Sequence, residues 1–88
     1  MELAEIKYRL ELLGYNFVEL DRKYNLSRGT CRLAVSSPSS KGEKAIAETL
    51  GLHPKEIWPT RYDGKGRRLK PQPKNEYLYT PKMRAEAR

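Results

Sequence analysis

Residues that carry chemistry are scarce in this sequence, which has one cysteine, one histidine and one tryptophan. A single cysteine excludes an internal disulfide, and one cysteine with one histidine is too few for a structural zinc site. Cys31 recurs with Ala34 and Val35 at helical spacing, which indicates a small buried side chain rather than a reactive thiol. His53 directly precedes Pro54, so we interpret it as a helix-start residue and not as a general base. We therefore expect no enzyme, no metal, no cofactor and no small-molecule ligand.

Long apolar runs are also absent, and no stretch could span a bilayer. The N-terminal MELAEIKYRL mixes charged with apolar residues and lacks the apolar core of a signal peptide, so we expect a cytoplasmic protein without membrane contact. With 88 residues, a third of them charged, the chain can form one small domain with a compact helical core. The net charge of +7 favours an acidic partner, nucleic acid first and an anionic membrane surface second.

The spacing of apolar residues predicts an amphipathic helix over residues 2–13, ended by Gly14. Its apolar face comprises Leu3, Ile6, Leu10 and Leu13. A second helix should begin at Asn16, whose side chain is a good N-cap with Glu19 following three residues later. This helix carries Phe17, Leu20 and Tyr24 on one face.

Asn25 should end the second helix, because asparagine tolerates the left-handed backbone that a sharp corner between helices requires. Leu26 should fill that corner. We expect Ser27 to cap a third helix, which packs Cys31 and neighbouring apolar residues against the second one. Asp21 would face the junction of the two helices, where a carboxylate must find a hydrogen-bond donor or point outward.

The serine-rich stretch SSPSS, residues 36–40, predicts a loop with free backbone amides. Ser40 and Glu43 then form a capping-box pattern for a fourth helix that ends at Gly51. The buried residues of this helix should be Ile46, Ala47 and Leu50. A fifth helix should begin at Pro54, bury Ile57 and Trp58, and end at Pro59.

The composition changes after Tyr62. Residues 63–88 contain eight Lys or Arg against three Asp or Glu, so most of the net charge lies there. A segment rich in proline, glycine and charge cannot bury enough surface to fold alone. We therefore expect a domain over residues 1–62 and a basic, mostly irregular arm over residues 63–88. Within the arm, docking and plain solvation of the apolar residues 77–79 are both open.

Two resemblances link these patterns to known families. Residues 16–35 resemble the helix-turn-helix of lambda-repressor-like DNA-binding proteins, with Asp21 where that family prefers a small residue. Residues 41–62, KGEKAIAETLGLHPKEIWPTRY, resemble the phage Ner and bacterial Ner-like (Nlp) transcriptional regulators. The matching positions are Lys41, Gly42, Glu43, Ile57, Trp58, Pro59, Thr60, Arg61 and Tyr62.

The resemblance implies an all-α, lambda-repressor-like helix-turn-helix domain of about five short helices that binds double-stranded DNA, with a recognition helix at about residues 28–35 in the major groove. Candidates for base readout are Arg28, Gly29, Arg32 and Leu33, since arginine pairs well with guanine and apolar groups contact thymine methyls. Candidates for backbone contacts are Ser27, Thr30, Ser37, Lys41, Lys44, Lys65, Arg67 and Arg68.

We thus expect a small sequence-specific transcriptional regulator, which could pair as a homodimer on DNA. The alternatives are a helical interaction module whose basic tail binds an acidic protein or membrane surface, and nonspecific DNA binding.

Overall fold

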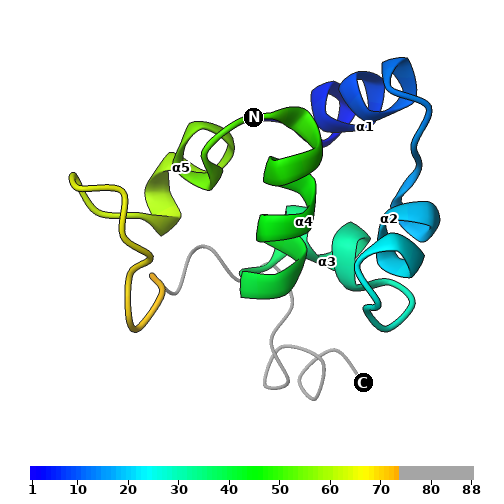
Figure 1. The fold of residues 1–88 in the computed structure, drawn as a ribbon. Coiled ribbons are helices and arrows are strands. Elements are labelled where there is room, and N and C mark those ends of the chain that lie inside the picture. The colour runs from blue at the N-terminus through cyan, green and yellow to red at the C-terminus, as the bar shows by residue number, and fades with distance from the viewer. Residues whose placement is uncertain (74–88) are drawn as a thin grey trace, which may run out of the picture.

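The structure is a computed structural model that describes residues 1–73, and in this range it is all-helical (Figure 1). The elements are α1 (Leu3–Leu12), α2 (Phe17–Lys23), α3 (Thr30–Ser36), α4 (Ser40–Leu50), α5 (Pro54–Ile57) and the short 3-10 helix η1 (Pro59–Arg61). The all-α class and the five short helices expected from the sequence are confirmed.

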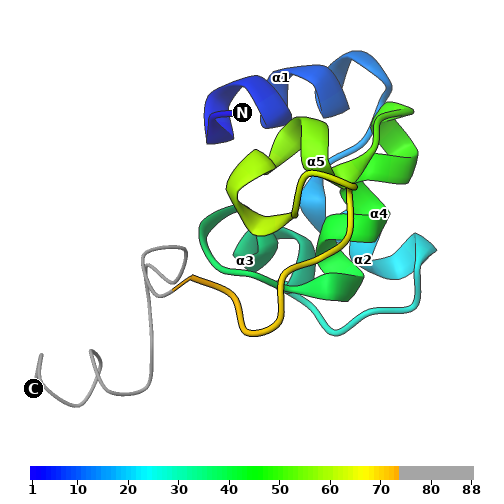
Figure 2. The ribbon, with the colours of Figure 1, turned by 90° about the vertical axis from the view of Figure 1, so that its left-hand side faces the viewer.

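Helix α4 lies at the centre and contacts all four of the other α-helices. Figures 1 and 2 show α1 near the upper end of α4 and α3 beside its lower half. The core formed around α4 consists of Ile6, Leu10, Leu20, Cys31, Ala34, Ala45, Ile46, Ala47, Ile57 and Trp58. The expected apolar faces of the helices therefore meet in a single core.

The expected apolar face of α1 is buried only in part. Ile6 and Leu10 are fully buried and Leu3 is half-buried, but Leu13 is 54% exposed, so its expected burial was wrong. The reason is that the helix ends at Leu12 and Gly14 turns the chain with a φ of 84°. Leu13 thus lies on the bend and not on the helical face.

The two asparagines of the helix-turn-helix, at the start of α2 and in the corner between α2 and α3, act as the sequence predicts. The Asn16 side chain accepts a hydrogen bond of 2.8 Å from the backbone N–H of Glu19, as expected for an N-cap. Asn25 has a φ of 56°, the left-handed conformation predicted for the corner. Leu26 is half-buried and packs against the core beside it.

Two predicted helix starts were displaced. Helix α3 begins at Thr30 with Gly29 as N-cap, so the expected cap at Ser27 was wrong. Gly29 has a φ of 93°, a conformation that glycine adopts without strain. The cap of α4 is Ser39 rather than Ser40, one residue earlier than expected, with its side chain accepting from the backbone of Gly42.

Helix α5 starts as the sequence predicts. The His53 ring accepts a hydrogen bond from the backbone of Lys55, and the Glu56 side chain accepts one of 2.6 Å from the His53 N–H. These two bonds form a capping box, with Pro54 at the first position of the helix. The helix-start interpretation of His53 is confirmed.

The chain continues to pack after Tyr62. Residues 62–68 form a hairpin, closed by an antiparallel bridge between Tyr62 and Arg68. Beyond it, the Gln72 amide donates bonds of 2.9 Å to the carbonyls of Arg61 and Leu69, and Gln72 is only 7% exposed. The division expected after Tyr62 therefore does not coincide with the end of the packed structure. The apolar cluster at residues 77–79 lies outside the described residues.

Candidate nucleic-acid interface

Helix α3 is the second helix of the helix-turn-helix, and its start is held by a carboxylate from α2. Asp21 is 2% exposed. One of its oxygens accepts a hydrogen bond of 2.8 Å from the Gly29 N–H, and the other accepts one of 2.9 Å from the Cys31 N–H. Asp21 thus supplies the cap that Ser27 was expected to supply. The two backbone N–H groups are the hydrogen-bond donors that its buried carboxylate requires.

The other end of α3 is held by Arg61. Its guanidinium donates to the carbonyl oxygen of Ala34 at 2.6 Å and to that of Val35 at 3.3 Å. Carbonyls in the last turn of a helix have no partner within the helix, so a cation from elsewhere can satisfy them. Arg61 is only 2% exposed and also packs over the Trp58 ring, 5.0 Å from its centroid.

Arg61 is part of a buried polar cluster centred on Glu43, which has no exposed surface. The Glu43 carboxylate accepts bonds from the Ser39 N–H and the Tyr62 hydroxyl, both at 2.7 Å. It also pairs with the guanidinium groups of Arg61 and Arg68 at 3.3 Å. This cluster connects the start of α4, the end of α3 and the hairpin.

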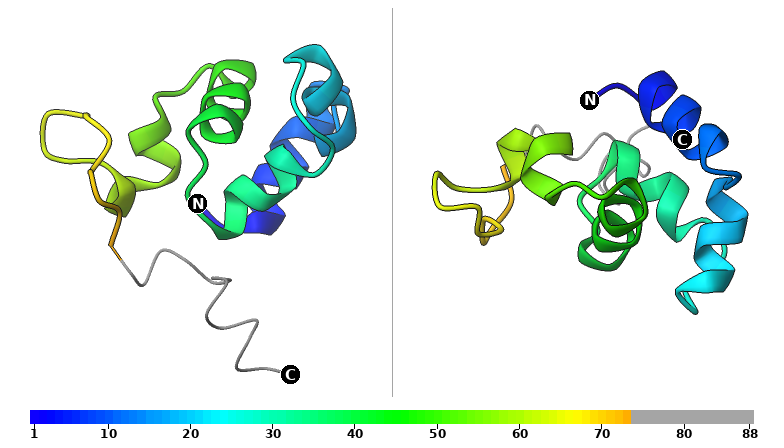
Figure 3. Two further views of the ribbon diagram at one scale, coloured as in Figure 1. Left: turned by 90° about the horizontal axis from the view of Figure 1, so that it is seen from below. Right: turned by 45° about the horizontal axis from the view of Figure 1, so that its top comes forward.

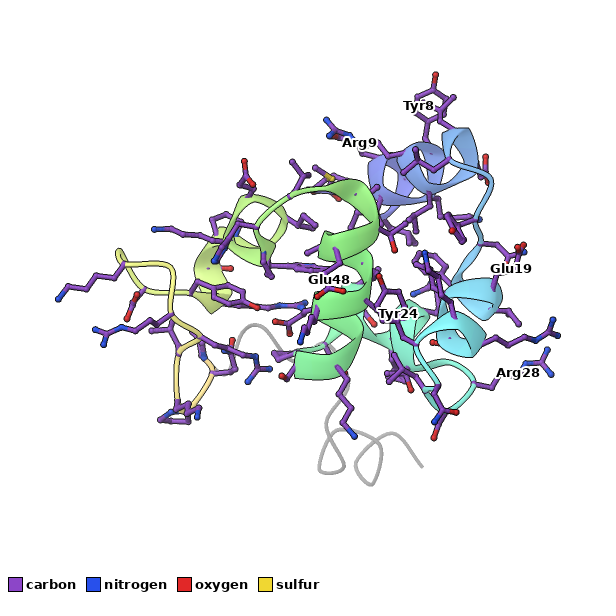
Figure 4. All side chains as sticks on the ribbon, in the orientation of Figure 1. Tyr8, Arg9, Glu19, Tyr24, Arg28 and Glu48 are labelled. Atoms are coloured by element: carbon purple, nitrogen blue, oxygen red, sulfur yellow. The ribbon has the colours of Figure 1, made fainter. Side chains whose placement is uncertain are left out.

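The remaining face of α3 is open. Arg32 and Leu33 are exposed, Leu33 by 52% of its surface, so Leu33 is not a core residue. Arg28 is exposed in the turn before α3, and Figure 4 shows it pointing away from the helices. Helix α3 therefore begins at Thr30, two residues later than the start expected for the recognition helix at 28–35. The left view of Figure 3, from below, looks onto α3.

This surface is positively charged. Residues 22–42 contain five Lys or Arg and no Asp or Glu. The carboxylates at either end of the stretch, Asp21 and Glu43, are both buried and hydrogen-bonded. The exposed cations near α3 therefore face no exposed carboxylate within their own segment, and the potential there favours an anion.

Lys41 and Lys44 are exposed in the first turn of α4. They line an open cavity of about 350 Å³ between the helix-turn-helix corner and α4, together with Tyr24, Asn25, Leu26, Ala45 and Glu48. Lys44 lies 4.0 Å from Glu48, whereas no ion pair is described for Lys41 within residues 1–73. Lys41 is therefore the better placed of the two to meet a phosphate.

The other expected backbone contacts fall into three environments. Ser27 is exposed, but Thr30 already donates its hydroxyl hydrogen to the Ser27 carbonyl at 2.7 Å. Ser37 is only 9% exposed, and its hydroxyl has no partner among the described residues. On the hairpin, Lys65 and Arg67 are exposed, with Arg67 3.4 Å from Asp63. Arg68 donates to the buried Glu43 carboxylate and so attaches the hairpin to the core.

The pKa values of Cys31, Tyr62 and Asp63 are shifted by their surroundings. Burial, then hydrogen bonding to Asp21, raises the pKa of the Cys31 thiol to about 12, in agreement with an unreactive core side chain. Burial, then the hydrogen bond to Glu43, raises the pKa of the Tyr62 hydroxyl. Hydrogen bonds led by the backbone of Arg67 lower the pKa of Asp63.

Within residues 1–73 there is no group of histidine, cysteine and acidic side chains that could hold a metal ion. No helix in the same range is long and apolar enough to cross a membrane.

Comparisons with known proteins agree with this geometry. Residues 1–74 match the family described as winged helix-turn-helix DNA-binding. A protein named negative regulator of transcription, from Escherichia phage D108, is 39% identical over 59 residues, which cover 67% of this chain and 81% of that protein. The sugar fermentation stimulation protein B of Escherichia coli (strain K12) is 41% identical over 59 residues, 67% of this chain and 64% of that protein. No solved structure matches.

Proposed function

The chain belongs to the winged helix-turn-helix DNA-binding family, and from this premise we propose that it reads double-stranded DNA sequence-specifically as a small regulator of transcription. The observation that carries the proposal is the open surface at the start of α3, where Arg28 and Arg32 are exposed and where residues 22–42 contain no carboxylate. A helix with such a face fits the major groove, where base edges carry the sequence information. The relative from phage D108 is named as a regulator of transcription, which supports the same role here.

We assign direct base readout to Arg28 and Arg32. Both are exposed, one just before α3 and the other within its first half, so both lie near the end that enters the groove. An arginine fork can bond the O6 and N7 atoms of guanine, and Leu33 offers an apolar contact for a thymine methyl. Gly29 has no side chain beside them, which allows close approach of the duplex.

Backbone contacts are assigned to the exposed residues around this helix. Lys41, with Lys44 beside it, can bind a phosphate at the start of α4, and Ser27 can bind one at the turn. Lys65 and Arg67 extend the basic surface onto the hairpin. Such contacts fix the register of the protein on the duplex without reading its sequence.

We further propose that two copies bind together on repeated half-sites, as small helix-turn-helix proteins often do. The spacing of the half-sites in selected sequences tests this directly, since a dimer places them about one helical turn apart or a multiple of it. A single isolated half-site would indicate binding as a monomer.

The proposal is tested by Arg28→Ala and Arg32→Ala in the full chain, each measured on the selected duplex and on duplexes with single base changes. Each substitution should weaken binding to the selected duplex by about 1 to 3 kcal/mol and remove the preference at one base pair. Lys41→Ala should instead weaken binding to all duplexes alike and reduce the salt dependence by about one phosphate contact.

Arg9→Ala is the control. Arg9 is an exposed arginine of α1, away from α3, and it pairs with Glu5 of the same helix. Its affinity and preference should equal those of the unmodified chain. If neither arginine substitution near α3 changes the base preference while the fold is intact, the groove assignment is wrong, and a protein or membrane partner for the basic surface becomes the better hypothesis.

A further inference from the structure

Helix α3 is short, and neither its N-cap nor its C-cap residue bonds to it through a side chain. It contains seven residues, its N-cap is a glycine without a side-chain acceptor, and its C-cap Ser37 leaves its hydroxyl without a partner among the described residues. A helix of two turns is marginal in isolation, because few hydrogen bonds offset the cost of fixing its backbone. Its position must therefore be set by contacts from other elements.

Two charged side chains provide those contacts, one at each end. Asp21 of α2 accepts from the N–H groups of Gly29 and Cys31 at the start of α3. Arg61 of η1 donates to the carbonyls of Ala34 and Val35 at its end. Each charge has the sign that the helix dipole favours at its end, the anion at the N-terminus and the cation at the C-terminus.

Both side chains are held rigidly. Asp21 and Arg61 are each only 2% exposed, so neither can exchange its partners freely for water. Asp21 belongs to a helix whose own start is capped by Asn16, and Arg61 is anchored by the buried Glu43. Displacing α3 along its axis would break charge-assisted hydrogen bonds at one end or at both.

We propose that Asp21 and Arg61 are positioning residues that fix the axial position and rotation of α3, and thereby set which base pair each of its exposed side chains meets. This inference rests on the proposed function. Neither residue touches DNA in this scheme, since both are almost completely buried, whereas Arg28 and Arg32 are exposed. Their effect should therefore fall on the selectivity of binding and not on the general attraction to phosphate.

Asp21→Asn is the most conservative change that tests the start of the helix. The amide keeps one acceptor oxygen, but its NH₂ group faces the second backbone donor, so either Gly29 or Cys31 loses its partner. Glu19→Gln on the same helix is the matched control, because it removes the same charge from an exposed side chain.

Arg61→Lys tests the other end and serves as a second variant if Asp21→Asn does not fold. Lysine keeps the charge but lacks the planar fork that reaches two carbonyls and a carboxylate together. Arg9→Lys is its control, an exposed arginine on α1.

The measurement is the ratio of affinities for two duplexes, the one that the unmodified full chain selects from a random pool and a scrambled duplex of the same composition. It is made at a temperature at which circular dichroism shows each variant fully folded. We expect both positioning variants to lower this ratio about tenfold with little change on the scrambled duplex, and both controls to preserve it. Hydrogen exchange in the free protein should show that, relative to the unmodified chain, both variants speed up exchange of the α3 amides more than exchange of the α4 amides.

The outcomes separate the two ideas. If the unmodified chain prefers its selected duplex and the folded variants keep the full ratio, Asp21 and Arg61 contribute only to stability and the inference is refuted. If the unmodified chain shows no preference at all, the proposed function fails, and the inference fails with it.

Discussion

Removing the charge of Glu43 should be among the most damaging conservative substitutions in the chain. The carboxylate has no exposed surface and accepts bonds from the Ser39 backbone, the Tyr62 hydroxyl and two arginines. In Glu43→Gln the amide can accept through one oxygen only, and the buried cation of Arg61 loses its counter-charge.

The size of the effect follows from this environment. Removing one member of a buried ion pair costs about 3 to 5 kcal/mol, because the other charge stays buried without compensation. A packed body of 73 residues has a free energy of unfolding of about 4 to 11 kcal/mol at typical values per residue. Glu43→Gln should therefore lower Tm by about 12 °C or more, or abolish cooperative unfolding altogether.

Thermal unfolding followed by circular dichroism measures this, with urea unfolding as a second method. The matched control is Glu48→Gln, which removes the same charge from an exposed position of the same helix, 4.0 Å from Lys44. An exposed pair of this kind contributes less than about 1 kcal/mol. A Glu43→Gln chain as stable as the Glu48→Gln control would refute the view that this cluster holds the fold together.

Three further predictions follow from the same packing. Gly42→Ala should destabilise the chain by about 1 to 2 kcal/mol in urea unfolding. The new Cβ would lie 2.6 Å from the Cβ of Ala34 and 2.9 Å from a backbone oxygen of α3, and this crowding outweighs the better helix propensity of alanine. Equal or greater stability would show that α3 and α4 can separate freely. A chain ending at Tyr62 should lose about 2 to 4 kcal/mol relative to one ending at Pro73, since it loses the bonds from the hairpin to the buried carboxylate, and equal Tm values would contradict the packing of the hairpin. The pKa of Cys31 rises on folding from 9.0 to about 12, so its contribution is complete below pH 9 and is lost as the pH rises towards 12; urea unfolding at about pH 8 and about pH 11 should show a larger loss for the unmodified chain than for Cys31→Ala, and equal losses would argue against burial of the thiol.

The sequence predicted the features of the fold that depend on neighbouring residues. Asn16, Asn25, Gly51 and the pair His53–Pro54 all act within one turn of their own position, through a side-chain cap or a left-handed backbone. Such signals can be recognised from a few consecutive residues. The helix count, the all-α class and the core therefore followed from local patterns.

The predictions that failed depend on residues distant in sequence. The cap of α3 comes from Asp21, which lies eight and ten residues before its partners. A local pattern could suggest only a residue close to the start of the helix, such as Ser27. Glu43 does cap the start of α4 locally, through the backbone of Ser39 rather than Ser40, but most of its partners could not be predicted. Its bonds to Arg61, Tyr62 and Arg68 span 18 to 25 residues and become visible only in the folded chain.

The candidate site shows the same division. Its exposed residues, Arg28, Arg32 and Lys41, could be named from the sequence because the helix-turn-helix spacing fixes which positions face outward. The residues that hold them in place could not, since a buried carboxylate or guanidinium is recognised only by its partners. The resemblance to the Ner and Ner-like regulators, carried by residues 41–62, is confirmed by the family and the relatives that the chain matches.

The most direct test of sequence-specific DNA binding is selection from a random duplex pool at physiological salt, using the full chain and a chain ending at Pro73. We expect both proteins to enrich the same short motif, with the full chain binding it more tightly because residues 74–88 add positive charge. Recovery of no motif by either protein, with retention on all duplexes alike, would contradict sequence-specific recognition by α3.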